Sequence, residues 1–357
     1  MSDLDGNAPL LAVEDLVVHY PVARGLVGTL GRRPKQVVHA VDGASFSLAE
    51  GEMLALVGES GCGKTTTAQT LMRMVEPASG RIRFRGTDIL GLSAGGMRAV
   101  RRKMQIIFQD PYESLDPRFR VRATVEEPLQ VHGLGGSREE RRLLVHDALV
   151  RAGLTPPELF VDRYPHQLSG GQRQRVAIAA SLVLGPELLI ADEPVSMLDV
   201  SVRAGVLRLL DSLRRDGLGI LMITHDLSTA AHFADRIAVM YLGRIVEEGP
   251  AREVVKNPQH PYTRALLSVV PKPDPRDRSR PELLAGETPD AVRIPSGCRF
   301  HPRCPIMVDD CTRIDPPLTL PAAATTPAHV AACIRSEHTD LAELSRAPAA
   351  TRGLAAR

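Results

Sequence analysis

The stretch GESGCGKT, residues 58–65, constrains the fold of this 357-residue chain more than any other feature. It matches the phosphate-loop pattern G-x-x-x-x-G-K-[ST] at every fixed position and follows the apolar run Met53–Val57. Glycines let the backbone curl so that successive N–H groups point inward at phosphate oxygens. A helix expected to begin near Gly63 or Lys64 adds partial positive charge at its first turn. The stretch therefore predicts a strand, a phosphate-binding turn and a helix.

Every residue of this loop is a candidate nucleotide contact. Lys64 can reach the β- and γ-phosphates, and the Thr65 hydroxyl can ligate Mg²⁺. Cys62 has the small side chain that suits a crowded turn, and a reactive thiol is the alternative interpretation. The candidate nucleotide-binding residues are Gly58, Glu59, Ser60, Gly61, Cys62, Gly63, Lys64, Thr65 and Thr66.

Complementary carboxylates come from ELLIADEP, residues 187–194. A short apolar run that ends in acidic residues fits a buried parallel strand with its chemistry at the C-terminal end. Asp192 can hold Mg²⁺ through its water shell, and Glu193 can polarise the water that attacks a γ-phosphate. Together with the phosphate loop, these residues predict a nucleotide-hydrolysing domain.

Strand and helix patterns alternate along the first 265 residues. Residues 11–19 alternate as a strand does, and residues 217–226, GLGILMITHD, fit a second buried strand. Between about residues 118 and 184 the patterns are helical, which predicts a helical subdomain. This alternation predicts an α/β fold with a largely parallel sheet.

The amino-acid composition of the chain changes after about Ala265. A Pro- and charge-rich stretch reads as a linker, and a small Cys/Pro-rich domain is expected to occupy residues 266–340. Residues 341–357 have the composition of a disordered tail.

Composition limits what the protein binds and where it works. The formal net charge of +2 is too small to suggest bulk nucleic-acid binding, and aromatic residues make up only 3%, with no Trp to stack on bases. Neither a secretion signal nor an apolar run of about 18 residues is present. The sequence therefore predicts a cytosolic protein that acts at a membrane only through a partner.

The stretch LSGGQ, residues 168–172, narrows the class of nucleotide hydrolase. A Ser-Gly-Gly opening of a helix is a second anion-facing N-terminus. LSGGQ resembles the signature motif of ATP-binding-cassette (ABC) ATPases, a P-loop NTPase (RecA-like) family. The resemblance implies that ATP lies between the phosphate loop of one subunit and the signature of another. The signature residues are Ser169, Gly170, Gly171 and Gln172.

Other marks of the ABC family follow in order. Gln109 resembles the Q-loop glutamine, which also ligates Mg²⁺, and His225 resembles the switch histidine that senses the γ-phosphate. Asp199 ends a stretch similar to the D-loop, in which Met197 replaces the usual Ala. Tyr20 is a candidate for stacking on adenine, with a packing role at a strand edge as the alternative. The resemblance covers residues 11 to about 265 and implies an ATPase with Glu193, His225 and Gln109 as its catalytic residues.

A second resemblance follows the ATPase motifs. NPQHPYTRALLSVVPKP, residues 257–273, and the later GCRFHPRCP are similar to the C-terminal region of ATPase subunits of dipeptide/oligopeptide importers. The N-terminal insertion within VVHYPVARGLVGTLGRRPKQVVHAVDGASF, residues 17–46, and the stretch IIFQDPYESLDPR fit the F-type subunit better than the D-type. This implies ATP-driven peptide import at the cytoplasmic face of the membrane, with a second ATPase subunit, two permeases and an external solute-binding protein. Nickel, glutathione or an oligosaccharide are alternative cargoes, and a soluble ABC ATPase outside transport is a further alternative.

Four of the five cysteines lie near the C-terminus with C-x₅-C-x₆-C spacing followed by one distant member. In a reducing compartment such cysteines favour metal ligation over disulfides. Four thiolates can hold a [4Fe–4S] cluster or a Zn²⁺ ion. The irregular spacing and the family resemblance favour the cluster, with zinc and plain buried thiols as alternatives. His301 and His329 are nearby substitutes as ligands, but each is expected to make structural hydrogen bonds instead. The predicted ligands are Cys298, Cys304, Cys311 and Cys333.

Overall fold

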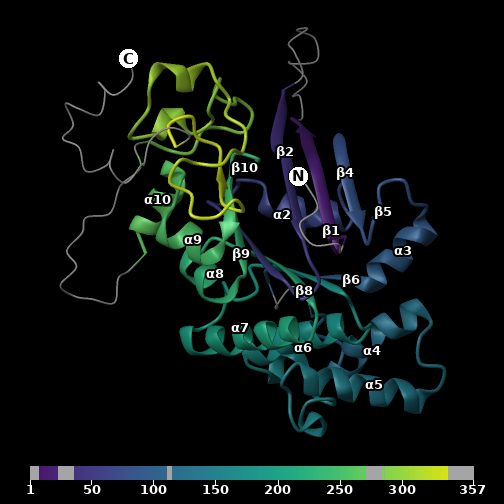
Figure 1. The fold of residues 1–357 in the computed structure, drawn as a ribbon. Helices are drawn as coiled ribbons and strands as arrows, with labels where there is room; N and C mark the ends of the chain where they lie inside the picture. Colours follow the sequence, from purple (N-terminus) through teal and green to yellow (C-terminus); the bar gives the residue numbers. More distant parts are fainter. Residues whose placement is uncertain (1–7, 23–35, 111–114, 271–283, 285, 337–357) are drawn as a thin grey trace, which may run out of the picture.

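The computed structural model describes residues 8–22, 36–110, 115–270, 284 and 286–336 (Figure 1). The predicted tail at 341–357, and most of the linker and of the N-terminal insertion, lie outside these residues.

A seven-stranded sheet forms the centre of the fold, with the strand order β11-β10-β9-β3-β8-β7-β6. Neighbouring strands from β9 to β6 run parallel, whereas β10 and β11 are antiparallel additions at one edge. This confirms the predicted α/β fold with a largely parallel sheet. The strands are β3 (Met53–Val57), β6 (Met104–Ile107), β7 (Leu188–Asp192), β8 (Gly219–Thr224), β9 (Arg236–Tyr241), β10 (Arg244–Pro250) and β11 (Val330–Ala331).

A second, antiparallel sheet has the order β2-β1-β4-β5. Its first strand covers the predicted residues 11–19 and pairs along most of its length with β2. Figure 1 shows this sheet standing beside the central one. The strands are β1 (Leu11–Pro21), β2 (Val37–Leu48), β4 (Ser79–Phe84) and β5 (Thr87–Asp88).

The predicted helical region contains three helices that pack on one another, α4, α5 and α6. Helix α5 begins at Arg138, because the Ser137 hydroxyl accepts a hydrogen bond from the Glu140 N–H and caps the first turn. Among the described residues, no helix is both long and apolar enough to cross a membrane. The α-helices are α2 (Lys64–Leu71), α3 (Ala94–Lys103), α4 (Val121–His132), α5 (Arg138–Arg151), α6 (Gly170–Leu182), α7 (Val200–Arg215), α8 (Leu227–Phe233), α9 (Ala251–Lys256) and α10 (Pro261–Ser268). Short 3-10 turns cover Pro157–Leu159, Pro165–Gln167, His301–Arg303 and Asp309–Thr312.

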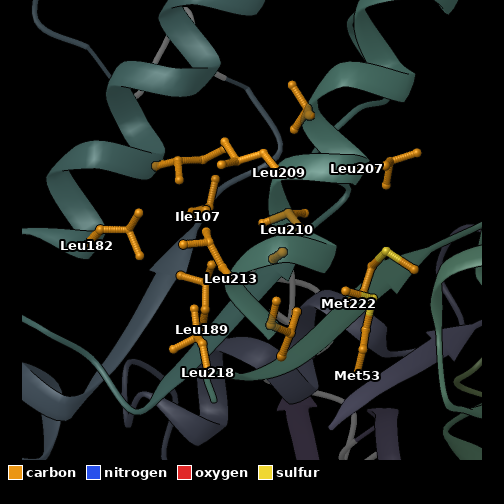
Figure 2. Packing of buried hydrophobic residues seen from close by; sticks show 14 of the residues in the cluster. Met53, Ile107, Leu182, Leu189, Leu207, Leu209, Leu210, Leu213, Leu218 and Met222 are labelled. Atoms are coloured by element: carbon orange, nitrogen blue, oxygen red, sulfur yellow. The ribbon is translucent and has the colours of Figure 1, made fainter. Parts of the chain in front are cut away.

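The central sheet is buried on both faces, and strand β3 shows how. Its alternate residues Met53, Ala55 and Val57 pack into a core shared with the helices (Figure 2), whereas Leu54 and Leu56 pack into a second core shared with the antiparallel sheet. All five side chains are buried. A strand with this period-two burial on both faces must be apolar throughout, as the sequence is.

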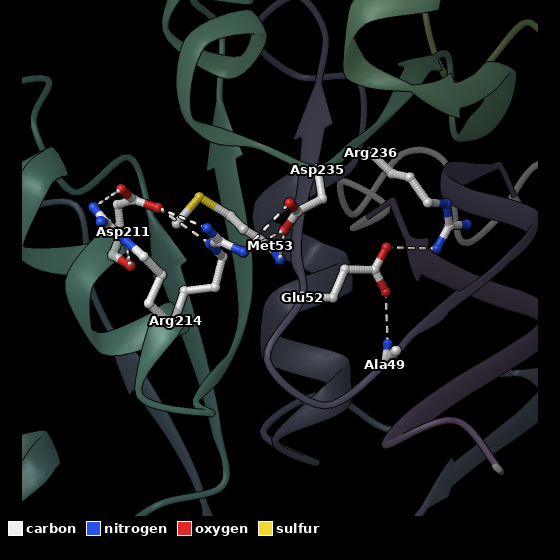
Figure 3. A network of polar contacts seen from close by, with 8 residues as sticks. Ala49, Glu52, Met53, Asp211, Arg214, Asp235 and Arg236 are labelled. Carbon is white, nitrogen blue, oxygen red and sulfur yellow. Dashed lines mark hydrogen bonds and ion pairs between the residues drawn. The ribbon is translucent and has the colours of Figure 1, made fainter.

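A polar network secures the start of β3, at the end opposite the phosphate loop (Figure 3). The Met53 N–H donates to Asp235 Oδ2 at 2.8 Å, and Asp235 also pairs with Arg214 at 3.4 Å. Next to it, Glu52 pairs with Arg236 at 2.8 Å. These contacts fix the start of β3 relative to α7 and β9.

The C-terminal segment packs against the central sheet and extends it. Figure 1 shows it beside β10 and α10, and β11 pairs antiparallel with β10. The fully buried His329 Nε2 lies 2.7 Å from Glu247 Oε1 of β10. Helix α10 spans the boundary that the sequence predicts near Ala265. The segment therefore joins the nucleotide domain through backbone pairing and a buried polar contact.

Candidate functional site

The phosphate loop connects β3 to α2 in a conformation that only glycine permits at key points. Gly63, which precedes α2, has φ +109°, and a Cβ there would lie 2.1 Å from the Ala40 carbonyl oxygen. A Cβ at Gly58 would lie 2.2 Å from the Met240 carbonyl oxygen. The loop is thus pressed against β2 and β9, and its glycines are required by close backbone approach as well as by conformation.

Lys64 lies inside the curve of the loop and is buried. Its Nζ donates to the carbonyl oxygens of Gly58 at 2.7 Å and Glu59 at 2.9 Å. Cys62 is 2% exposed within the second core, and burial raises the pKa of its thiol. The packing interpretation of Cys62 is therefore favoured over a reactive thiol, which would need a lowered pKa.

Glu193 contacts the other two predicted catalytic side chains, Gln109 and His225. Its Oε2 accepts from Gln109 Nε2 at 3.1 Å, and its Oε1 lies 3.1 Å from His225 Nδ1. Glu193 has φ +45°, a left-handed conformation that is costly for a residue with a side chain. Strands β6, β7 and β8 each end beside this cluster, so parallel pairing explains how residues 84 and 32 positions apart meet. A carboxylate oriented in this way by two polar side chains can accept a proton from a bound water molecule.

Asp192, one residue before, has the properties of a cation ligand. Its side chain is 2% exposed, and its Oδ1 has no hydrogen-bond partner. Burial raises the pKa of its carboxyl, although a hydrogen bond with the Thr65 hydroxyl and the charge of Lys64 oppose this. A buried, unsatisfied carboxylate oxygen next to a hydroxyl suits Mg²⁺, which prefers hard oxygen ligands. Asp192 and Thr65 would hold this ion, which would neutralise charge on the phosphates of ATP.

The signature residues begin helix α6. The Ser169 hydroxyl accepts from the Gln172 N–H at 3.3 Å, and the Ser169 N–H donates to Gln172 Oε1 at 3.0 Å, which forms a capping box. A Cβ at Gly171 would lie 2.3 Å from Val202 Cγ1 of α7. Asp199 directly precedes α7, so close packing of α6 on α7 brings the signature and the D-loop-like residues together.

Tyr20 lies on β1 opposite Val38 of β2 and is half-buried. It packs against the second hydrophobic core. Both interpretations of this residue, adenine stacking and strand-edge packing, therefore stay open.

The four C-terminal cysteines line one small cavity together with His260 and Phe300. Cys311 and Cys333 are buried, and Cys298 and Cys304 are half-buried. Burial and the neighbouring thiols raise the pKa of Cys298 and of Cys304 to about 12. His301 Nδ1 lies 2.9 Å from the Cys298 carbonyl oxygen, and His329 pairs with Glu247, so both histidines make structural contacts as expected. The convergence of side chains up to 35 positions apart in sequence is the main property of this site.

Sequence reasoning missed two residues that contact the phosphate loop. The Glu59 carboxylate accepts from Arg303 Nη1 at 2.9 Å, and the Glu59 N–H donates to Tyr262 Oη at 2.9 Å. Tyr262 and Arg303 lie in the stretches HPYTRALL and HPRCP, whose sequence indicates the importer family but not these contacts. The sequence offers one indication of this role, because Arg303 is a charged residue between the predicted metal ligands Cys298 and Cys304.

Comparisons with known proteins agree with this geometry. Residues 41–196 match the ABC transporter family, and residues 246–311 match the oligopeptide/dipeptide transporter C-terminal region. A probable peptide ABC transporter ATP-binding protein of Sinorhizobium fredii is 47% identical over 92% of this chain and 92% of its own length. The dipeptide transport ATP-binding protein DppF of Escherichia coli is 46% identical over 87% of this chain and 91% of its own.

Solved structures resemble the nucleotide domain. A dimeric ATP-binding cassette in a post-hydrolysis state with ADP and Pi has a TM-score of 0.58 and 29% identity, covering 68% of this chain and 99% of that one. CbiO1 of Clostridium perfringens, part of an ABC transporter complex, has a TM-score of 0.58 and 32% identity, covering 69% of this chain and 90% of its own. With its phosphate loop, its clustered Gln109, Glu193 and His225, and its matched C-terminal region, the chain belongs to the ATP-binding subunits of ABC transporters of the oligopeptide/dipeptide group, and it is an ATPase.

Proposed function

We propose that this ATPase powers the import of dipeptides and oligopeptides, working at the cytoplasmic face of the membrane. Its partners would be a second ATPase subunit, two permeases and an external solute-binding protein. The observation that carries the proposal is the similarity to proteins named for peptide transport. These proteins are 46–47% identical to this chain over 87–92% of its length, and the match includes the C-terminal region.

Within this function, ATP would bind the phosphate loop and be closed over by the signature residues 169–172 of the second subunit. Glu193 acts as the general base toward the attacking water, with Gln109 and His225 orienting its carboxylate and sensing the γ-phosphate. Closure and reopening of the ATPase pair would then switch the permeases between two conformations. The dimeric state of the solved post-hydrolysis cassette supports this arrangement.

A surface near the catalytic cluster supports a membrane partner. Phe108, directly before Gln109, is 41% exposed, and Phe119, before α4, is 49% exposed. Phe108 and Phe119 lie at the two ends of the segment that links β6 to the helical region. Exposed apolar side chains of this size suit contact with a permease. A partner that binds there would be close to the Gln109–Glu193 contact.

Isolation of the intact membrane complex tests the cargo. The tagged chain, purified in mild detergent, should bring down two permeases and a second ATPase. In proteoliposomes, its solute-binding protein loaded with di- or tripeptides should stimulate ATP hydrolysis, and a Glu193→Gln complex should show no stimulation. Stimulation by a nickel-, glutathione- or oligosaccharide-loaded binding protein instead would reject peptide import, and purification without any permease would reject transport.

We also propose that residues 266–340 form a C-terminal domain around a [4Fe–4S] cluster held by Cys298, Cys304, Cys311 and Cys333. The shared cavity supports this, because it brings together four thiols that are up to 35 positions apart in sequence. A bound cluster would cross-link a segment that has little regular structure of its own.

Metal analysis checks the cluster proposal. Anaerobically purified protein should be brown and contain iron and sulfide in near-equal amounts, about four of each per chain. Cys304→Ser should lose the colour and most of the iron. Cys62→Ser is the matched control, because Cys62 lies in the phosphate loop, and it should keep both. A colourless preparation with one zinc per chain would replace the cluster with zinc.

A further inference from the structure

The C-terminal segment holds Glu59, the second residue of the phosphate loop, by both its backbone and its side chain. Tyr262 Oη accepts from the Glu59 N–H at 2.9 Å. The Glu59 carboxylate accepts hydrogen bonds from Arg303 Nη1 at 2.9 Å, from Arg303 Nη2 at 3.2 Å and from the Thr288 hydroxyl at 2.7 Å. The fork of Arg303 thus binds both carboxylate oxygens, which is the strongest geometry for such a pair. Every one of these partners lies more than 200 residues from the loop in sequence.

Glu59 is connected in turn to Lys64, the residue that is predicted to contact the phosphates. Its carbonyl oxygen accepts from Lys64 Nζ at 2.9 Å. Burial raises the pKa of the Glu59 carboxyl, but the hydrogen bonds from Arg303 and Thr288 outweigh this and lower the pKa overall, so the side chain is anionic. A shift of Glu59 would therefore displace both the loop backbone and the position from which Lys64 reaches a nucleotide.

Arg303 is placed by the same short stretch that carries two of the cysteines. Its side chain is 8% exposed, and its guanidinium lies 6.0 Å from the centre of the Tyr241 ring. Phe300 packs edge-on against Tyr241, with ring centres 5.3 Å apart, and lines the cysteine cavity from its other side. Residues 298–304 therefore present thiols to the cavity and an arginine to the phosphate loop.

Arg299 makes a second connection beside the first. Its Nη1 donates to the Leu242 carbonyl oxygen at 2.6 Å, and its Nη2 pairs with Asp42. The next residue, Gly243, donates its N–H to the carbonyl oxygen of Cys62, at the far end of the loop, at 2.9 Å. Two arginines that each adjoin a cysteine thus support the loop near both of its ends.

We propose that Arg303 is a positioning residue for the phosphate loop, and that through it the four-cysteine segment sets the affinity of the ATPase for ATP. The arginine touches no substrate atom; it holds Glu59, and Glu59 holds the loop and Lys64. The proposal depends on the ATPase activity but not on the cargo, and it holds for whichever metal the cysteines bind. Loss of the four-cysteine fold should therefore weaken ATP binding at a distance.

A double-mutant cycle between Glu59 and Arg303 tests the direct contact. Glu59→Gln and Arg303→Gln should each raise the Kd of a fluorescent ATP analogue, and the KM for ATP, by about tenfold, and kcat of Arg303→Gln should stay within about twofold of the parent. The double variant should resemble either single one, because both remove the same interaction. Arg303→Lys, which keeps the charge without the fork, should recover only part of the affinity. Arg313→Gln is the matched control, since Arg313 is exposed and its guanidinium pairs with Asp310.

Coupling to the cysteines is measured in the same binding assay on the protein as purified, with the metal that it carries. Cys304→Ser should raise the Kd for the ATP analogue in the parent and leave it unchanged in the Arg303→Gln background. If Arg303→Gln does not fold, Thr288→Val removes one hydrogen bond to Glu59 from an exposed position and should raise the Kd by about twofold to threefold. An unchanged Kd in folded Arg303→Gln, additive effects in the double variant, or an equal effect of Cys304→Ser in both backgrounds would each overturn the proposal.

Discussion

Glu193→Gln is expected to lower steady-state ATP hydrolysis by about 10²- to 10⁴-fold while leaving ATP binding intact. The amide keeps the size of the side chain and can still contact Gln109 and His225, which lie 3.1 Å from the carboxylate oxygens. It cannot accept a proton from the attacking water. Phosphate release and titration of a fluorescent ATP analogue measure the two properties separately.

The same variant should accumulate as a closed, ATP-bound assembly with the second ATPase subunit. Reopening would require hydrolysis, so size-exclusion chromatography with ATP and Mg²⁺ should show a larger species than the parent does. Glu76→Gln serves as the control, because Glu76 is an exposed glutamate that pairs with Arg73. Turnover of Glu193→Gln near the parent rate would contradict its assignment as the general base.

Gly63→Ala is expected to destabilise the protein by about 3 kcal/mol or more and to abolish tight ATP binding. An alanine at φ +109° is strained, and its Cβ would lie 2.1 Å from the Ala40 carbonyl oxygen. The backbone of the loop must therefore move, and with it the N–H groups that face phosphate. Urea unfolding and ATP-analogue titration check the two effects.

Gly61→Ala separates conformational strain from steric overlap. Gly61 has φ +80°, but a Cβ there meets nothing within 4 Å. Its cost should be that of the left-handed conformation alone, about 1–2 kcal/mol. Equal destabilisation by the two substitutions would show that the contact with Ala40 does not restrain the loop.

Local patterns predicted much of the fold. Strand β3, the helix after it and the end of β7 were all predicted, because an apolar run, a glycine turn and an acidic strand end are properties of adjacent residues. The antiparallel sheet was predicted only in its first strand. Its other strands are half-buried, and their partners depend on register between distant segments.

The cysteines show where prediction from sequence ends. Spacing indicated a shared site, but only packing brings Cys333 to the other three, because β11 must first pair with β10. The metal is still a prediction.

The sequence by itself determined the chemistry of the nucleotide site, since the phosphate loop, Asp192, Glu193 and the signature are short contiguous motifs whose residue types carry their function. Tertiary structure decided which distant side chains support that chemistry. Arg303 reaches Glu59 across 244 residues because the C-terminal segment docks on the edge of the central sheet. A contact of this kind depends on the direction of a buried side chain after packing, and no local pattern specifies that direction.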